Sequence, residues 1–588
     1  MHIQQSKKNV NITVPDNTTY NRQAAPLRSK YFAEGKPRSL AEMLSRAADI
    51  YADRTQVVEF VGDEQIAYSD VCLYRDAACL AASLCKKGLQ GRKIAVLGKN
   101  SYAWLVAFFA VSCGVGVVVP LDKEMQGEKL SALLGKAEVE IVFCDERFFK
   151  SVSNVLGAER CVLLNGTKEN VQTIQMLIDE GKTQFASEND IAFLRDPKAD
   201  DTAAIVFTSG TTGANKGVML SHRNLIENAF CLSRLLPPMA SALSVLPMNH
   251  VFELGCTVLT AVTINGILYI NDSLRHFMKN AVTCMPQMIV VVPSFIDFLY
   301  KEIDLQLKKS GIKDGAQALE KMPLPVRYFV KRRIAEKFGG QLPYLACGGA
   351  PVRIDYLKAL QAAGFEIYIG YGLSESSPIA ALNLQTRKKP DAVGRPISKD
   401  SAFRIANPDE DGIGEIQLSG ANITKGYYND TLATQASFAE GWFSTGDYGR
   451  IDKDGDLYIT GRKKNLIVLD NGKNISPEEI EQYLLQNISY LREAVVFESI
   501  KQFGDTQTKV IAAAVYVNTE DFPAMSEQKI AEKVQKEIVT SCFRLPAFMR
   551  VGDVEVFTKE FEKTTTLKIV RQAVVELYNQ RKGEVVHA

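Results

Sequence analysis

Hydrophobic and β-branched residues recur in short runs through the first two thirds of the chain, with longer helical patterns between them. The clearest runs are Lys93–Leu97, Val115–Val119, Ile141–Cys144, Ala203–Phe207, Met288–Val292 and Glu366–Ile369. Strands that alternate with helices are joined by crossover connections, which favour largely parallel sheets covered on both faces. The pattern predicts an α/β fold whose large N-terminal domain, residues 31–460, contains doubly wound sheets.

The spacing of the hydrophobic runs changes towards the end of this domain. Shorter runs alternate there with Gly, Asn and Asp turns, at Ala402–Ile405, Gly414–Leu418 and Leu457–Ile459. Short strands joined by tight turns are typical of antiparallel sheets. We therefore expect a small β-barrel-like subdomain between about Asp391 and Ile459.

A small α+β pattern follows, and we place the boundary at Gly461–Lys464. Its first helix has a start signal, with Ser476 as N-cap, Pro477 at the first helical position and Glu479 at the third. That order predicts a capping box, and proline loses nothing at this position because its missing N–H would be unpaired there anyway. Residues 461–588 are expected to form a small mobile C-terminal domain.

Two segments bear on membrane and export questions. Residues 1–30 are rich in Asn, Gln, Thr and Lys and lack the apolar core of a signal peptide, which predicts a flexible tail. The uncharged stretch Ala103–Leu121 imitates a membrane span, but it contains two glycines and ends in a valine run before Pro120. A buried helix followed by a buried strand explains it better, so no transmembrane segment is expected.

The net charge and the spacing of the cysteines argue against several kinds of function and site. The formal net charge is +1, so no overall field draws the chain to nucleic acid or to an anionic membrane, and only a local patch would support peripheral membrane contact. The eleven cysteines are scattered without a C-x-x-C pair, which argues against a disulfide framework or a zinc site and fits a reducing cytoplasm.

The most informative motif is Ala203–Val218, in which a buried strand runs into a loop of glycines and hydroxyl residues. Glycines let the backbone approach a phosphate chain, hydroxyl and N–H groups donate to its oxygens, and Lys216 neutralises charge. A Walker A motif cannot be matched here, and a flexible linker would need neither the strand nor the lysine. The loop residues expected to bind phosphate are Thr208, Ser209, Gly210, Thr211, Thr212 and Gly213.

Thr208–Val218 is similar to the phosphate loop of the adenylate-forming superfamily, which includes acyl-CoA ligases, peptide-synthetase adenylation domains and beetle luciferase; Asn215 stands where that family usually has proline. Other segments resemble family motifs in the same order. Gly349 and Ala350 resemble the segment that packs against adenine. Tyr371-Gly372-Leu373-Ser374-Glu375 resembles a motif in which the tyrosine stacks on adenine, the serine lies near the α-phosphate and the glutamate coordinates Mg²⁺.

Three further motifs extend the resemblance. Asp447 matches the ribose-binding aspartate, and Gly461-Arg462-Lys463-Lys464 matches the hinge motif, which implies that Arg462 contacts the nucleotide and Lys464 is the hinge residue. Lys568 matches the C-terminal catalytic lysine, although Leu567 stands where many members have glycine and Lys563 is the alternative. By the same resemblance, Mg²⁺ is held by Glu375 with Thr211.

The resemblance implies that ATP and a carboxylic acid form an acyl-adenylate, which then passes its acyl group to the thiol of coenzyme A. Lys216 would hold the departing pyrophosphate, and Lys568 would bridge the carboxylate and the α-phosphate. Pro247–Glu253 resembles the segment lining the acyl tunnel, with His250 at its gate. The run after it is apolar, which suits a fatty or aryl acid. Lys463–Glu481 resembles the long-chain acyl ligases, which implies a medium- or long-chain fatty acid as the substrate.

Other functions share these motifs. The nearest is an adenylating enzyme that loads a separate phosphopantetheine carrier protein, since no carrier domain is recognisable in the chain. Luciferase-like monooxygenation would use every nucleotide motif as well. A nucleotide sensor without turnover is disfavoured, because it would not need Lys568.

Overall fold

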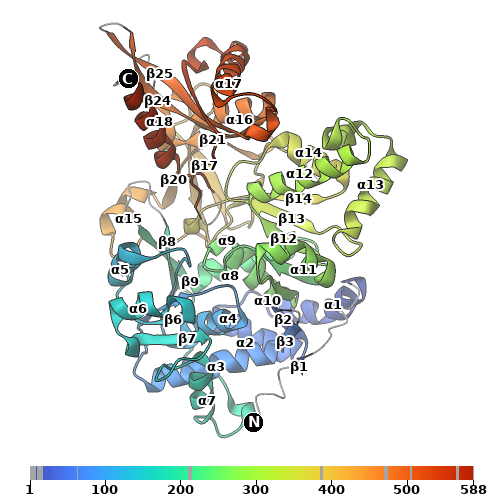
Figure 1. Cartoon of the computed structure of the whole chain (residues 1–588). Coiled ribbons are helices and arrows are strands. Elements are labelled where there is room, and N and C mark those ends of the chain that lie inside the picture. The colour runs from blue at the N-terminus through green and yellow to red at the C-terminus, as the bar shows by residue number, and fades with distance from the viewer. Residues whose placement is uncertain are drawn as a thin grey trace.

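The computed structural model describes residues 8–9, 17–62, 64–208, 215–384, 389–468, 474–503, 506–564 and 568–586. Figure 1 shows a large domain with the smaller C-terminal unit above it, next to the strands β20 (Trp442–Ile451) and β21 (Leu457–Arg462). The fold is mixed α/β with two large sheets, a third antiparallel sheet and a small α+β domain, as predicted.

The largest sheet has ten strands in the order β1-β3-β2-β11-β10-β12-β13-β14-β15-β16. The pairs from β2 to β14 through β11, β10, β12 and β13 are all parallel, and the strands at both ends pair antiparallel. Its strands are β1 (Lys8–Asn9), β2 (Thr55–Val61), β3 (Glu64–Ser69), β10 (Ser241–Ser244), β11 (Ile267–Ile270), β12 (Met288–Val291), β13 (Tyr344–Gly348), β14 (Glu366–Tyr371), β15 (Ala381–Asn383) and β16 (Arg395–Pro396).

The second sheet has six strands in the order β7-β6-β4-β5-β8-β9, parallel except for the last pair. They are β4 (Lys93–Leu97), β5 (Val117–Pro120), β6 (Val139–Asp145), β7 (Cys161–Asn165), β8 (Thr202–Thr208) and β9 (Lys216–Ser221). The antiparallel β8–β9 pair is a hairpin, and its connection is the segment that resembles a phosphate loop.

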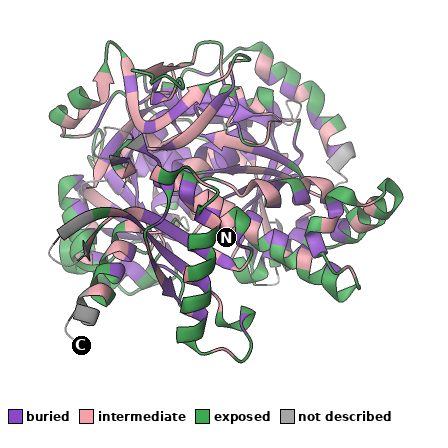
Figure 2. Cartoon of the chain, turned by 90° about the horizontal axis from the view of Figure 1, so that it is seen from above, coloured by how far each residue is buried: buried purple, intermediate pink, exposed green. Residues whose placement is uncertain are grey.

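Helices cover both faces of both sheets. One buried cluster joins the two sheets through helices between them, and two others lie on the outer faces, so the large domain is layered as the alternating pattern predicts. Figure 2 shows buried residues concentrated in this interior and exposed ones along the outer helices. The helices of the large domain are α1 (Asn17–Ala33), α2 (Leu40–Tyr51), α3 (Asp70–Lys86), α4 (Tyr102–Ala110), α5 (Gly127–Lys136), α6 (Phe149–Leu156), α7 (Ile174–Lys182), α8 (His222–Leu235), α9 (Val251–Glu253), α10 (Thr260–Ile264), α11 (Phe277–Cys284), α12 (Pro293–Lys309), α13 (Leu324–Glu336), α14 (Ile354–Ala363) and α15 (Thr431–Ser437).

The third sheet is antiparallel and contains β17 (Ala402–Ala406), β18 (Gly414–Ser419), β19 (Phe438–Ala439), β20 and β21. The small domain after it has its own core, formed by residues from Ile467 onwards. Its elements are β22 (Ile467–Val468), β23 (Asn474–Ile475), α16 (Pro477–Asn487), β24 (Leu491–Phe503), β25 (Thr506–Val517), α17 (Glu527–Cys542), β26 (Asp553–Phe557) and α18 (Arg571–Val586).

The prediction of a flexible tail over residues 1–30 is wrong for its second half, because α1 begins at Asn17. Tyr20 and Ala24 are buried in the core beside the ten-stranded sheet, and the Tyr20 hydroxyl donates to the Asn265 carbonyl at 3.1 Å. Arg28, one turn further on, donates to the Met239 carbonyl at 2.6 Å. Tyr20, Ala24 and Arg28 follow one another at intervals of four residues and therefore share one face of the helix. The polar composition of the segment gave no indication that this face packs against the domain.

A second correction concerns the start of α16. Pro477 is at the first helical position, but the predicted capping box is absent, because the Ser476 side chain accepts no backbone hydrogen bond. Its hydroxyl instead donates to the Glu478 carboxylate at 2.9 Å.

The stretch Ala103–Leu121 folds as predicted, with α4 and one π-helical turn followed by the buried strand β5. No helix within the described residues is long and apolar enough to cross a membrane. All eleven cysteines are free thiols.

Candidate functional site

The β8–β9 hairpin positions the first cationic side chain of the site. Thr208, the last residue of β8, is the register partner of Lys216, the first residue of β9. The two residues therefore flank the base of the loop. Ser209, Gly210, Thr211, Thr212 and Gly213 lie outside the described residues.

Tyr427 links this hairpin to the predicted metal ligand. Its segment runs beside β9, with the Tyr428 N–H donating to the Gly217 carbonyl at 2.7 Å. Lys216 Nζ lies 4.7 Å from the centre of the Tyr427 ring, and the Tyr427 hydroxyl donates to Glu375 at 2.9 Å. Sequence reasoning missed Tyr427, because nothing in its local pattern distinguishes it from a core aromatic residue.

Tyr371 and Asp447 meet where the largest sheet faces the third sheet. Tyr371 ends β14 and Asp447 lies within β20, and the tyrosine hydroxyl donates to the Asp447 carboxylate at 2.9 Å. Arg462 Nε is 3.0 Å from the other carboxylate oxygen. Burial raises the Asp447 pKa, while Arg462, Tyr371 and Lys568 oppose the rise. The structure thus brings three predicted nucleotide-binding residues together.

The turn after Tyr371 is held by close backbone packing. A methyl group on Gly372 would collide with the Pro378 carbonyl, so only glycine fits there without a shift. Ser374 begins the 3₁₀ turn Ser374–Ser376, which places Glu375 towards Tyr427. The Glu375 carbonyl accepts from the Thr424 N–H at 2.8 Å, which fixes the turn to the neighbouring segment.

Lys568 reaches the site from the small domain. Gly349, just after β13, has a φ of +90°, and a methyl group placed on it would lie 3.9 Å from Lys568 Nζ. Ala350 follows it and is exposed. The Lys568 side chain therefore approaches the predicted adenine segment, and it also lies close enough to Asp447 and Arg462 to interact electrostatically with both.

The surroundings of Lys568 lower its pKa. Desolvation is the main cause, the positive charge of Arg462 adds to it, and Asp447 acts in the opposite direction. The Lys568 side chain is exposed to solvent even though many protein atoms lie around it, so solvent screens part of this shift. Lys563 is occupied elsewhere, in ion pairs with Glu493 at 2.5 Å and Glu560 at 3.2 Å. The geometry thus brings Lys568 rather than Lys563 to the residues predicted to bind the nucleotide.

His250, the residue expected at the gate of the acyl tunnel, immediately precedes α9. Its Nε2 is 3.8 Å from the carboxylate of Asp122, a neighbour that sequence reasoning did not identify. Burial lowers the His250 pKa, Asp122 raises it, and Lys568 lowers it further, so we expect a neutral imidazole at neutral pH. Lys568 therefore lies near enough to His250 to interact with it electrostatically.

Glu253 is an isolated acid in an apolar environment. Its side chain is completely buried, and burial raises its pKa to about 8. Ser244 and Thr257 lie near enough to oppose the shift, but neither hydroxyl is in hydrogen-bonding geometry with the carboxyl oxygens. The residues that follow, Leu254–Ile264, are all buried, and most of them are apolar.

The predicted hinge lies where the two domains join. Arg462 ends β21, Lys464 lies in the 3₁₀ turn Lys463–Asn465, and the small-domain core begins at Ile467. Gly461 packs directly against the Ser476 side chain, which leaves no room for a Cβ in this arrangement. One short connection therefore separates two independently packed cores.

The residues present fit a Mg²⁺ ion held mainly by phosphate oxygens. No cluster of three or more His, Cys, Asp or Glu side chains suited to a metal occurs in the part of the chain that the structure describes. Mg²⁺ at nucleotide sites is usually held by one or two carboxylates together with phosphate oxygens. Glu375 supplies such a carboxylate, and Thr211 lies outside the described residues.

Comparison with known proteins agrees with this geometry. Residues 44–428 match the AMP-binding enzyme family, and residues 464–583 match the AMP-binding enzyme C-terminal domain. A chloroplastic long-chain-fatty-acid–acyl-carrier-protein ligase of Arabidopsis thaliana is 25% identical over 99% of this chain and 90% of its own length. The long-chain-fatty-acid–CoA ligase FadD15 of Mycobacterium tuberculosis is 26% identical over 85% of this chain and 88% of its own.

Solved structures share the fold. The O-succinylbenzoate coenzyme A synthetase of Bacillus subtilis, in complex with ATP and magnesium, superposes with a TM-score of 0.70 and is 20% identical, covering 91% of this chain and 99% of its own. The first family model alone spans more than half of the chain. Together with the convergence of Lys568, Asp447 and Tyr371, this match shows that the protein belongs to the AMP-binding enzyme family and is an adenylate-forming ligase.

Proposed function

We propose that this enzyme activates a medium- or long-chain fatty acid as its acyl-adenylate and transfers the acyl group to coenzyme A. The observation that carries the proposal is the approach of Lys568 from the small domain to Gly349, Asp447 and Arg462 of the large one. A lysine at that position can neutralise charge on the α-phosphate and on the attacking carboxylate together. No other step of nucleotide binding needs a cation from a second domain.

In the first half-reaction, a carboxylate oxygen of the acid attacks the α-phosphorus of ATP, and pyrophosphate leaves. Asp447 would accept from the ribose hydroxyls, Tyr371 would lie against adenine, and Lys216 would hold the departing phosphates. Mg²⁺, when bound beside Glu375, supplies charge neutralisation to the phosphate oxygens. Catalysis by these residues is mainly alignment of two mutually repelling anions and electrostatic stabilisation of the transition state.

The acyl side of the site supports an apolar acid. The segment after His250, made of α9, the following π-helical turn and α10, is largely buried and mainly apolar, and mainly apolar surroundings favour aliphatic substrates. Long-chain fatty acids are also named as substrates of the two relatives described above. Glu253, with its raised pKa, would be a neutral carboxylic acid at neutral pH and so compatible with an apolar neighbour.

The second half-reaction requires the thiol where Lys568 stands. We propose that the small domain, whose core begins at Ile467, rotates about Lys464 and replaces Lys568 with the loop around Gly472 and Lys473, which lies outside the described residues. Such hinge motions exchange two discrete domain arrangements. The thiol sulfur then attacks the acyl carbon, and AMP leaves.

A panel of carboxylic acids, scored by pyrophosphate release, tests the proposal. We expect release with saturated acids of medium or long chain and little with acetate or amino acids. AMP should appear in step with acyl-CoA when coenzyme A is added. Formation of ADP in place of AMP would contradict adenylation, and a preference for amino acids would contradict the acyl assignment alone.

An acyl-carrier-protein acceptor is the second candidate. It is favoured by one observation, the match to the Arabidopsis thaliana carrier-protein ligase over 99% of this chain. The purified complex of the enzyme with its acyl-adenylate can be mixed with either free coenzyme A or phosphopantetheinylated carrier protein. The rate of AMP release with each then distinguishes the two acceptors. Faster AMP release with coenzyme A supports our proposal, and faster release with the carrier protein supports the alternative.

A further inference from the structure

One helix of the large domain exposes apolar side chains together with cations. The apolar ones are on α13, where Leu324, Val326, Tyr328 and Phe329 are 76%, 45%, 64% and 65% exposed. Nowhere else in the described chain are four large exposed apolar side chains found within six consecutive residues. Single exposed apolar residues are ordinary, but a contiguous group marks an interaction surface. We call these four residues the α13 apolar patch.

The α13 helix presents apolar side chains on two faces. Ile334 and Ala335 face the interior, while Phe329 lies near the middle of the outward side. The rings of Tyr328 and Phe329 are in edge-to-face contact, with centroids 6.2 Å apart. Figure 1 shows α13 at the outer edge of the large domain, beyond α12 and α14. A protruding helix of this kind can reach a flat surface before the rest of the domain does.

Cations surround the α13 apolar patch. The helix contains Arg327, Lys331, Arg332 and Arg333 against one acid, Glu336, and Lys337 follows directly. Arg332 lies 3.9 Å from Glu336 on the exposed surface, whereas Lys331, Arg333 and Lys337 form no ion pair with any residue the structure describes. The whole chain carries a net charge of only +1, so this helix is a local exception. We call these cations the α13 basic cluster.

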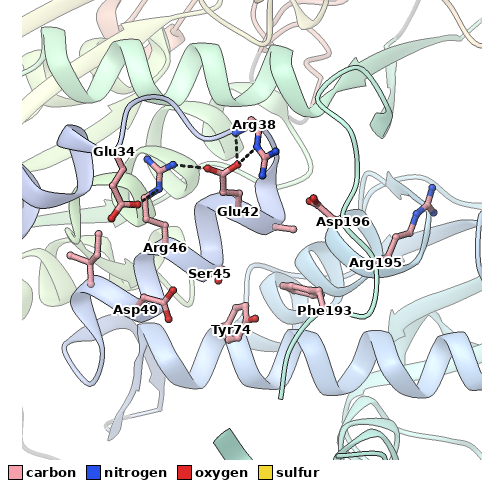
Figure 3. A pocket seen from close by; sticks show the side chains of 12 residues that line it. Glu34, Arg38, Glu42, Ser45, Arg46, Asp49, Tyr74, Phe193, Arg195 and Asp196 are labelled. Carbon is pink, nitrogen blue, oxygen red and sulfur yellow. Dashed lines mark hydrogen bonds and ion pairs between the residues drawn. The ribbon is translucent and has the colours of Figure 1, made fainter. Parts of the chain in front are cut away.

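Arginines in another exposed region of the domain behave differently. In the hollow between α2, α3 and the segment of Phe193, Arg46 lies between the carboxylates of Glu34 and Glu42, and Arg38 pairs with Glu42 as well (Figure 3). These charges are neutralised within the protein. The α13 basic cluster lacks such acids, so its charge is directed outwards.

We propose that α13 is a docking surface for an anionic lipid bilayer, with the α13 apolar patch entering the headgroup region and the α13 basic cluster facing acidic headgroups. Aromatic and leucine side chains beside lysine and arginine are the combination by which helices bind at the membrane interface. An acidic carrier protein would bind through the cations alone, and Phe329 and Leu324 would stay exposed to water. A bilayer would instead bury these apolar side chains. The proposal goes beyond the proposed function and does not depend on which acid is adenylated.

The position of α13 adds a functional reason. The stem of Lys331 packs over Gly364 at the end of α14, and α14 begins close to the predicted adenine segment. That helix has ten residues and is therefore about 15 Å long. A bilayer at α13 would therefore lie one short helix from the residues predicted to bind the nucleotide.

Vesicle flotation with the full chain tests this proposal. We expect the protein to float with vesicles of equal parts phosphatidylglycerol and phosphatidylcholine, and to remain largely unbound with phosphatidylcholine alone or at high salt. Each cation near an anionic surface contributes about fivefold to partitioning, so Arg332→Glu with Arg333→Glu should lower binding by more than tenfold. Leu324→Ser with Phe329→Ser should lower it by a comparable factor.

Helix α17 provides matched controls. Phe543, directly after it, is 63% exposed, almost the same as Phe329, but α17 has three lysines balanced by three glutamates. Phe543→Ser should therefore leave vesicle binding unchanged, as should Lys536→Glu. Adenylation of a soluble acid should be unaffected by every α13 variant, which also reports that they fold.

The proposal is overturned if the wild-type protein does not float with anionic vesicles, or if α13 variants bind them as well as the wild type does. It is also overturned if the α13 variants lose binding to an acidic carrier protein while vesicle binding stays the same. Equal losses in the α13 and Phe543 variants would show non-specific adsorption and would contradict it too.

Discussion

The two halves of the predicted nucleotide site, one in the large domain and one in the small domain, are built in opposite ways. In the large domain, the polar side chains already have partners: Tyr371 donates to Asp447, Asp447 pairs with Arg462, and Tyr427 donates to Glu375. In the small domain, Lys568 forms no ion pair with the residues that the structure describes. Residues of the large domain that hold one another in place can bind the nucleotide through both half-reactions. Lys568 belongs to a separately packed domain, so in our proposal it can move away from the nucleotide once the adenylate has formed.

We expect the largest effect on activity when the Lys568 ammonium group of the small domain is removed. Lys568→Ala should lower ATP–pyrophosphate exchange by about 10²–10³, the usual cost of losing one preorganised transition-state donor. ATP binding, measured by calorimetry, should change far less because the large-domain residues remain.

Lys563→Ala is the matched control, because it removes a lysine of the same segment that is paired with Glu493. Its exchange rate should stay within a few-fold of the wild type. If the two variants behaved alike, or if Lys563→Ala were the more damaging, the assignment of the catalytic lysine would be reversed.

The next effect concerns the half of the site in the large domain. Asp447→Asn keeps the shape of the side chain but removes the charge that pairs with Arg462 and that would accept from the ribose. Hydrogen bonds to charged groups contribute about 1.5–3 kcal/mol, so the KM for ATP should rise about 10- to 100-fold. Steady-state pyrophosphate release over a range of ATP concentrations measures it, and an unchanged KM would contradict the ribose role.

A smaller effect is expected at the junction between the halves. Lys464→Pro fixes φ near −65° and so restricts the connection that must rotate. Acyl-CoA formation from preformed adenylate should slow by about tenfold or more, while adenylation stays within a few-fold. Lys464→Ala, which leaves the backbone free, should preserve both half-reactions, and equal losses of both in Lys464→Pro would argue against a hinge at this residue.

Some parts of the fold and of the predicted site could be identified from the sequence, and others could not. Strands such as Lys93–Leu97 were predicted at their observed bounds, because parallel strands buried on both faces are continuous apolar runs. The segments bearing Asp447, Arg462 and Lys568 could be identified because their motifs resemble a known family. Tyr427 and Asp122 could not, since each acts through a neighbour distant in sequence, and only the fold brings that neighbour close.

Two predictions from local sequence patterns were wrong because contacts in the folded chain determine the structure at those places. Residues 17–30 have a polar composition, yet Tyr20, Ala24 and Arg28 attach them to the domain as part of α1. At Ser476 the sequence offered a capping serine, but the Glu478 carboxylate competes for its hydroxyl. Both errors have the same physical cause, because a short-range pattern does not include the partners that the folded chain provides.

The smallest predicted effect sharpens the electrostatic link between the halves. Desolvation and Arg462 hold the Lys568 pKa below its ordinary value, so the ammonium needed for adenylation is lost as pH rises through that lowered pKa. Arg462→Gln removes a positive neighbour and leaves Asp447 unopposed, and both changes raise the Lys568 pKa. The alkaline limb of the exchange rate against pH should therefore move to higher pH, by less than about one unit, since the main cause of the shift is burial. The position of the limb is the measurement, because the variant also alters nucleotide contacts and hence the absolute rate. A limb that moved to lower pH would mean that Lys568 and Arg462 do not share the site.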